Sequence, residues 1–172
     1  MRTGPASQPI PRTFGGKMLL HKIEFDNKEP LYCGPWAIAA ATGLSPQAIV
    51  ELIQAQRLLG RSGFREPMRA KRAAKPGPVK FMDFYEIEGT LKAIGYEVRH
   101  FNLPHRIKVW QFIEGIAKNP APGPVICRIG GHFFALSGCG RQLCDSHSHQ
   151  PEPTEGKRYH GASITHALVI VG

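Results

Sequence analysis

Helical spacing of apolar residues dominates the first two-thirds of this chain, and strand patterns dominate the last third. Pro35 and Gly43 frame the first helix, following the preference for proline just inside the start and glycine just after the end. Helices followed by strands indicate an α+β protein, with N-terminal helices packed on a C-terminal antiparallel sheet. The predicted helices cover 34–42, 45–59, 82–94 and 107–117; the predicted strands cover 96–101, 123–129, 132–137, 141–145 and 164–171, with a polar loop over 146–161.

The length and composition indicate one globular domain. The chain has 172 residues, of which 42% are hydrophobic and 20% are charged, within the range of folded domains. Residues 1–16 contain several glycines and prolines and are expected to be a flexible tail, which leaves 17–172 as a single domain. No apolar segment approaches the roughly 20 residues that span a bilayer, and no signal-peptide pattern opens the chain. We therefore expect a cytoplasmic protein without a membrane partner.

Positive charge is concentrated in one segment. The net charge of the chain is +9. Between Arg57 and Lys80 there are eight basic residues against the single acid Glu66, so this segment carries +7 of that total. The pattern predicts a basic loop at about 60–80, which is either a solvated surface loop or a contact for nucleic acid or an acidic partner.

Cys33 stands at the predicted start of the first helix, where Gly34 and Pro35 allow a tight entry. A thiol there meets the positive end of the helix dipole and unpaired backbone N–H groups, which favour the thiolate and lower the pKa. A cysteine nucleophile needs this environment. The alternative is a buried cysteine that packs as a small hydrophobe.

Asn27 lies six residues before Cys33 in a polar turn. Its side-chain amide could donate a hydrogen bond to an oxyanion, together with the backbone N–H of Cys33. A turn-forming asparagine with no chemical role is the alternative interpretation.

His132 and Asp145 occupy the two ends of a predicted hairpin. His132 opens a strand after Gly130-Gly131, a pair of glycines that would leave room for a close approach, and Asp145 ends the next strand. A hairpin of this length can bring the two side chains together, so that the carboxylate holds the imidazole in the correct tautomer. His132 would then accept the proton of Cys33 and later donate one to the leaving group.

His166 is a rival for the role of the base, because the segment from Thr165 to Gly172 resembles the strand that bears the catalytic histidine in papain. In that scheme an Asn or Asp should follow, and none does. His132 is preferred because an acid lies downstream of it. The remaining histidines are expected at the surface: His100, His105, His147, His149 and His160.

The four cysteines are expected to be reduced thiols, in keeping with the absence of an export signal. Cys139 and Cys144, with His147 or His149, offer a weak zinc pattern, since thiolate and imidazole are zinc ligands. A second CxxC pair is missing, and a short polar turn explains the two histidines equally well. The preferred interpretation therefore contains no metal.

The order of these residues resembles that of the papain-like cysteine peptidase superfamily. The segment CGPWAIAAATG, a histidine at a strand start about a hundred residues later and an acid on the next strand carry the resemblance, which covers roughly residues 25–146. The chain is also similar in outline to small bacterial and phage proteins of this type, including the peptidase domains that process bacteriocin leaders. The resemblance implies a papain-like fold with Cys33 as nucleophile, His132 as general base, Asp145 as orienting acid and Asn27 as oxyanion donor. Family members more often have Gln at the last position, and Asn is one methylene shorter.

The function that the resemblance implies is a cysteine hydrolase with a peptide or protein substrate and no cofactor. It would cleave a peptide, isopeptide or related amide bond through a thioester intermediate, although the same groups can catalyse acyl transfer. The alternative is a non-catalytic protein of the same fold, in which the basic loop over 61–80 engages nucleic acid or an acidic partner.

Overall fold

The computed structural model describes residues 19–24, 32–58, 79, 82–148, 150–156 and 159–171. The predicted tail over 1–16 lies outside these ranges, and so does nearly all of the predicted basic loop. The expected contact of that loop with nucleic acid or an acidic partner therefore stays a prediction.

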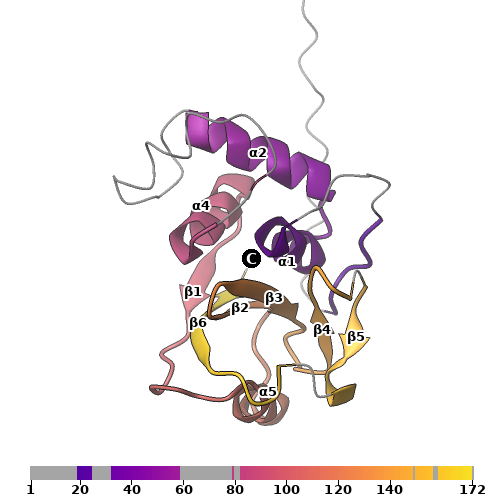
Figure 1. Cartoon of the computed structure of the whole chain (residues 1–172), viewed down its shortest axis with the longest axis vertical. Coiled ribbons are helices and arrows are strands. Elements are labelled where there is room, and N and C mark those ends of the chain that lie inside the picture. Colours follow the sequence, from indigo (N-terminus) through magenta and orange to yellow (C-terminus); the bar gives the residue numbers. More distant parts are fainter. Residues whose placement is uncertain are drawn as a thin grey trace, which may run out of the picture.

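The described chain is a mixture of helices and one antiparallel sheet, which confirms the α+β class (Figure 1). The helices are α1 (Cys33–Thr42), α2 (Pro46–Leu58), α4 (Phe84–Ile94) and α5 (Val109–Lys118). The strands are β1 (Val98–His100), β2 (Val125–Ile129), β3 (His132–Leu136), β4 (Gln142–Cys144), β5 (Glu152–Pro153) and β6 (Ile164–Ile170). Their order in the sheet is β1-β6-β2-β3-β4-β5, and every neighbouring pair is antiparallel.

Local signals in the sequence explain where the helices begin and end. Gly43 and Gly95 follow α1 and α4 in the left-handed region, with φ of 74° and 103°, where a side chain would be strained. Before α2, the Ser45 hydroxyl accepts a hydrogen bond from the Ala48 N–H at 3.2 Å. The four predicted helices are confirmed, whereas β1 is shorter than the predicted strand and the short strand β5 was not predicted.

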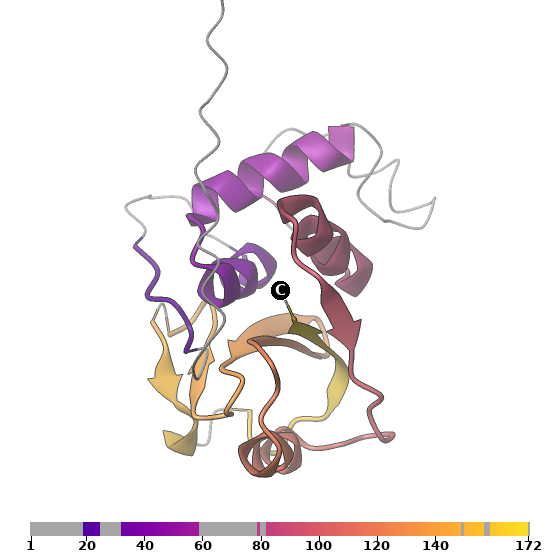
Figure 2. The ribbon, with the colours of Figure 1, turned by 180° about the vertical axis from the view of Figure 1, so that it is seen from behind.

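The sheet separates two hydrophobic clusters. On β3, Phe133 and Ala135 belong to the cluster that contains α1, and the alternating Phe134 and Leu136 belong to the cluster that contains α5. Figures 1 and 2 show α1, α2 and α4 on one side of the sheet and α5 on the other. The sequence pattern did not predict which face of the sheet α5 would cover. Its apolar stripe explains this position, because Val109, Phe112 and Ile116 must be buried and the first face is already covered.

Helix α1 is the central helix of the first cluster, since all its residues from Gly34 to Thr42 are buried. Its side chains are apolar on every face, as expected for a helix that is enclosed by the protein.

Among the described helices, none alone is long and apolar enough to cross a membrane. Helices α1 and α2 would meet that requirement only as a pair, and the chain bends by 120° between them.

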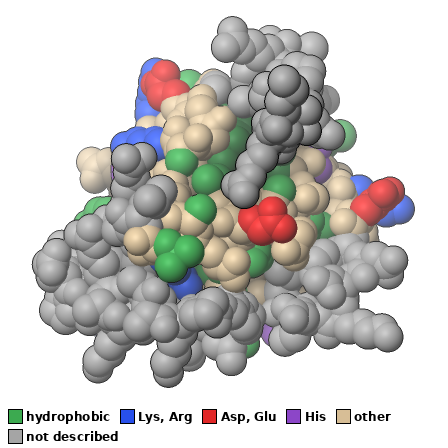
Figure 3. Space-filling view, turned by 90° about the horizontal axis from the view of Figure 1, so that it is seen from above, with side chains coloured by type: hydrophobic (Ala, Val, Ile, Leu, Met, Phe, Trp, Pro, Cys, Tyr) green, Lys and Arg blue, Asp and Glu red, His purple; other side chains and the backbone are tan. Residues whose placement is uncertain are grey.

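A buried ion pair joins α2 to α4. The Arg57 guanidinium contacts the Glu86 carboxylate at 2.7 and 3.0 Å, and the Glu86 side chain is fully enclosed. One of the eight basic residues counted above therefore has its charge neutralised inside the fold. On the face seen from above, around α2, charged and hydrophobic side chains lie next to one another (Figure 3).

Candidate active site

Cys33 is the first residue of α1, and its side chain is half-buried where the start of this helix meets β3. The first N–H groups of a helix have no acceptor within the helix, so the Cys33 N–H is available to an incoming oxygen. The next residue packs closely: a Cβ on Gly34 would lie 2.5 Å from the Met82 sulfur, so a larger residue there would displace the Met82 side chain. The sequence Cys-Gly therefore fits a helix start that is packed closely against Met82.

The environment of Cys33 favours the thiolate. Burial raises the pKa of the Cys33 thiol, but hydrogen bonds from the His132 side chain and the Phe133 and Gly34 backbone, with the charge of His132, outweigh burial. The pKa of this thiol therefore lies below its ordinary value. By contrast, burial raises the pKa of the Cys144 thiol to about 11.

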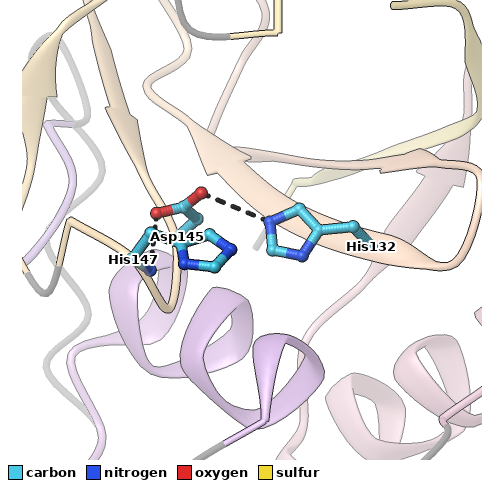
Figure 4. A group of neighbouring side chains, drawn as sticks. All are labelled: His132, Asp145 and His147. Carbon is cyan, nitrogen blue, oxygen red and sulfur yellow. Dashed lines mark hydrogen bonds and ion pairs between the residues drawn. The ribbon is translucent and has the colours of Figure 1, made fainter.

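His132 is the first residue of β3 and contacts Asp145 across the β3–β4 hairpin (Figure 4). Its Nε2 atom lies 3.3 Å from Asp145 Oδ2 and 2.9 Å from the Tyr159 hydroxyl, which leaves Nδ1 as the nitrogen for Cys33. Burial lowers the pKa of His132, but the hydrogen bonds and charges of Asp145 and Cys33 dominate and raise it to about 9. The geometry thus favours an imidazolium beside a thiolate.

Asp145 is fully buried, and both of its carboxylate oxygens have partners. Oδ1 accepts the backbone N–H groups of His147 and Ser148 at 2.9 and 2.8 Å, and Oδ2 faces His132 and Tyr159. Burial raises the pKa of this carboxyl, yet the hydrogen bonds from His132, Tyr159 and the backbone outweigh burial and hold the pKa well below its usual range. Asp145 is therefore a fixed negative charge that can orient the imidazole.

Tyr159 is a member of this cluster that the sequence analysis missed. Its hydroxyl donates to Asp145 Oδ2 and contacts His132 Nε2, and its ring packs on His132 and Phe134 with centroids 5.3 and 5.5 Å away. The only signal in the sequence is an aromatic residue in the predicted polar loop over 146–161.

A metal ion has one possible set of ligands among the described residues. The donor atoms of His132, Asp145 and His147 lie within 4.8 Å of one another (Figure 4). Both oxygens of Asp145 already accept hydrogen bonds, and His132 Nε2 already has two partners. The Asp145 oxygens and His132 Nε2 therefore have hydrogen-bond partners within the protein.

The cysteines of the weak zinc pattern do not form part of this group. Cys144 is buried in the first hydrophobic cluster, and Cys139 contacts the Ser137 hydroxyl at 3.5 Å in a turn. His149, the other residue named with them, lies outside the described residues.

His166, the rival base, lies on β6 opposite Arg128 and is exposed. Its ring packs on Phe84 at 4.8 Å. Burial, followed by the charges of Arg128 and His100, lowers the pKa of His166, which is the reverse of the shift at His132. The structure thus places His132, not His166, beside Cys33.

Gly130-Gly131 borders open space, because a Cβ at either position would meet nothing within 4 Å. The close approach for which these glycines leave room therefore stays a prediction. Gly130 also serves the turn between β2 and β3, where its φ of 53° favours glycine. The remaining predicted residue, Asn27, lies outside the described residues. The structure therefore brings together Cys33, His132 and Asp145 and adds Tyr159.

No family model matches the chain. No curated protein matches it either.

Proposed function

We propose that this protein is a papain-like cysteine hydrolase that cleaves a peptide, isopeptide or related amide bond. The observation that carries the proposal is the contact of the Cys33 thiol with His132, whose other ring nitrogen faces Asp145 at 3.3 Å. A thiol, an imidazole and a carboxylate in this order are the parts of a nucleophile activated by an oriented base. The papain-like part of the proposal is supported by the position of the thiol, at the start of a helix that packs on an antiparallel sheet.

In the first half of the reaction, the Cys33 thiolate attacks the substrate carbonyl carbon. The resulting oxyanion is stabilised by the Cys33 N–H at the start of α1 and, in our prediction, by Asn27. The C–N bond then breaks, the His132 imidazolium gives its proton to the departing amine, and a thioester to Cys33 remains. Asp145 keeps the imidazole aligned and stabilises its charged form.

In the second half, His132 removes a proton from water, which attacks the thioester carbonyl. The C–S bond breaks, the acid product leaves and the Cys33 thiolate is restored beside the imidazolium. If an amine replaces water as the acceptor, the same steps transfer the acyl group. The reaction is therefore hydrolysis when water attacks the thioester and acyl transfer when an amine attacks it.

The first test uses p-nitrophenyl acetate as a minimal acyl donor. We expect a burst of p-nitrophenol equal to one acetyl group on Cys33, followed by turnover. Cys33→Ser and His132→Ala should lose the turnover. Cys139→Ser is the matched control, because it removes another partly exposed thiol and should leave the turnover unchanged. Acetylation without turnover, or turnover that survives Cys33→Ser, would contradict the proposal.

A second test addresses the bond that is cleaved. The protein is incubated with a mixed peptide library, and new termini are identified by mass spectrometry against Cys33→Ser. New termini that require Cys33 would support a peptidase. Turnover of p-nitrophenyl acetate with no new termini would exclude cleavage of the ordinary peptide bonds in that library. The substrate would then be an isopeptide or another amide.

A further inference from the structure

We propose that Tyr159 is a positioning residue that stands between His132 and Asp145 and aims the imidazole at Cys33. The inference rests on the proposed hydrolase function, and it makes the cluster a chain of four residues. The Asp145 carboxylate holds the Tyr159 hydroxyl by a hydrogen bond, and this hydroxyl in turn orients the His132 ring.

The distances favour this order. The Tyr159 oxygen lies 2.9 Å from His132 Nε2, near the common length of a hydrogen bond, whereas Asp145 Oδ2 lies 3.3 Å from the same nitrogen. The tyrosine oxygen is therefore the nearer acceptor for the hydrogen on Nε2. The Tyr159 hydroxyl in turn donates to Asp145 Oδ2.

The protons are consistent with this chain in both states of the histidine. When Nδ1 accepts the Cys33 proton, the imidazolium carries a hydrogen on each nitrogen. When Nδ1 is free to accept, the neutral ring carries its hydrogen on Nε2. In either state Nε2 donates, the tyrosine oxygen accepts, and the hydroxyl donates to the carboxylate.

Tyr159 is held in this position by its backbone and its ring. Its φ of 58° lies in the left-handed region, which costs a non-glycine residue free energy and persists where surrounding contacts impose it. The ring is stacked at 5.5 Å on Phe134, and the Tyr159 carbonyl accepts the Ala162 N–H at 2.7 Å. These contacts fix the hydroxyl over the edge of His132.

The electrostatic surroundings of His132 give the expected consequence of removing the hydroxyl. Among the residues that the structure describes, the titratable groups that face this ring are Cys33, Asp145 and Tyr159, with the His147 ring stacked at 5.4 Å. Without the hydroxyl, the imidazolium loses its nearest acceptor and becomes a weaker partner for the thiolate. The Cys33 thiolate should then form only at higher pH.

The experiment compares Tyr159→Phe, which keeps the ring, with Tyr96→Phe. The control removes a hydroxyl that contacts the Thr42 carbonyl at 3.4 Å, away from the cluster. Two quantities are measured: the pH profile of Cys33 alkylation by iodoacetamide, and the hydrolysis of p-nitrophenyl acetate. We expect Tyr159→Phe to shift the alkylation midpoint upwards and to slow hydrolysis by about tenfold or more, as for loss of a hydrogen bond to a charged group. Tyr96→Phe should change neither.

A spectroscopic measurement keeps the inference testable if the variant is less stable. Nitrogen-15 NMR of the histidine rings should show a hydrogen-bonded Nε2–H for His132 in the native chain, and this signal should shift or exchange faster in Tyr159→Phe. If the alkylation profile, the hydrolysis rate and this signal all match the native chain, Tyr159 only packs and the inference is overturned. If the native chain itself lacks a selectively reactive Cys33, the proposed function fails, and the NMR signal alone decides the contact.

Discussion

The first residue of helix α1, Cys33, and the first residue of strand β3, His132, are in direct contact through their side chains. Each of these residues begins an element whose next residues are buried. The two reacting groups therefore stand at the edge of the core and are partly open to solvent, while their backbones are fixed by the core. Such placement reduces the freedom that must be lost when a substrate binds.

The pH dependence of hydrolysis should be bell-shaped. The acylation step, which kcat/KM reports, needs a Cys33 thiolate and a protonated His132. Because the pKa of Cys33 lies below its ordinary value, activity should rise at a lower pH than the ionisation of a free thiol near about 8.5. Because the pKa of His132 is about 9, activity should fall as the pH passes that value. The measurement is the hydrolysis of p-nitrophenyl acetate between pH 5 and 10, corrected with Cys33→Ser; a rate that only increases up to pH 10 would argue against the ion pair.

Asp145→Asn should lower hydrolysis by about 10²- to 10⁴-fold, the usual contribution of an oriented acid–base group. The asparagine oxygen can still accept the His147 and Ser148 N–H groups, so the turn after β4 should be preserved. The check is the steady-state rate together with the melting temperature. A folded variant with nearly native activity would show that His132 does not depend on this carboxylate.

The two candidate histidines should behave differently. His132→Ala should reduce hydrolysis by about 10²-fold or more, because the base and acid are removed. His166→Ala should leave the rate within about twofold, since this side chain lies on β6 beside Arg128 and Phe84. Rates are measured for both variants at pH 7. The reverse ranking would transfer the role of the base to His166.

Arg57→Met should destabilise the fold by about 3–5 kcal/mol, because it removes the guanidinium that the buried Glu86 carboxylate contacts at 2.7 Å. Lys92→Met is the matched control, since it breaks the exposed pair with Glu88 and should cost about 1 kcal/mol or less. Urea denaturation gives both values. The double variant Arg57→Met with Glu86→Gln should recover part of the loss; equal losses in the single and double variants would show that the Glu86 charge is not the cause.

The parts of the structure that the sequence predicts are those set by short-range signals. Gly43, Gly95 and the Ser45-Pro46 pair mark helix ends within a few residues of the true boundaries. The β3–β4 hairpin likewise places His132 near Asp145, because a hairpin register follows from its turn.

The parts that the sequence does not predict depend on contacts between distant segments. The position of β6 between β1 and β2 requires pairing across much of the chain, and no local pattern encodes it. The place of Tyr159 depends on a left-handed backbone and on Phe134, neither of which is visible in a polar loop.

The interior position of β6 also bears on how the protein is made. Strand β6 follows all the other strands in sequence, yet it is paired on both sides, with β1 and with β2. As the chain leaves the ribosome, the hairpin of β2 and β3 can form early, but β1 has no place in the sheet until residues 164–170 emerge. Assembly of the complete sheet is thus delayed until these residues have been translated.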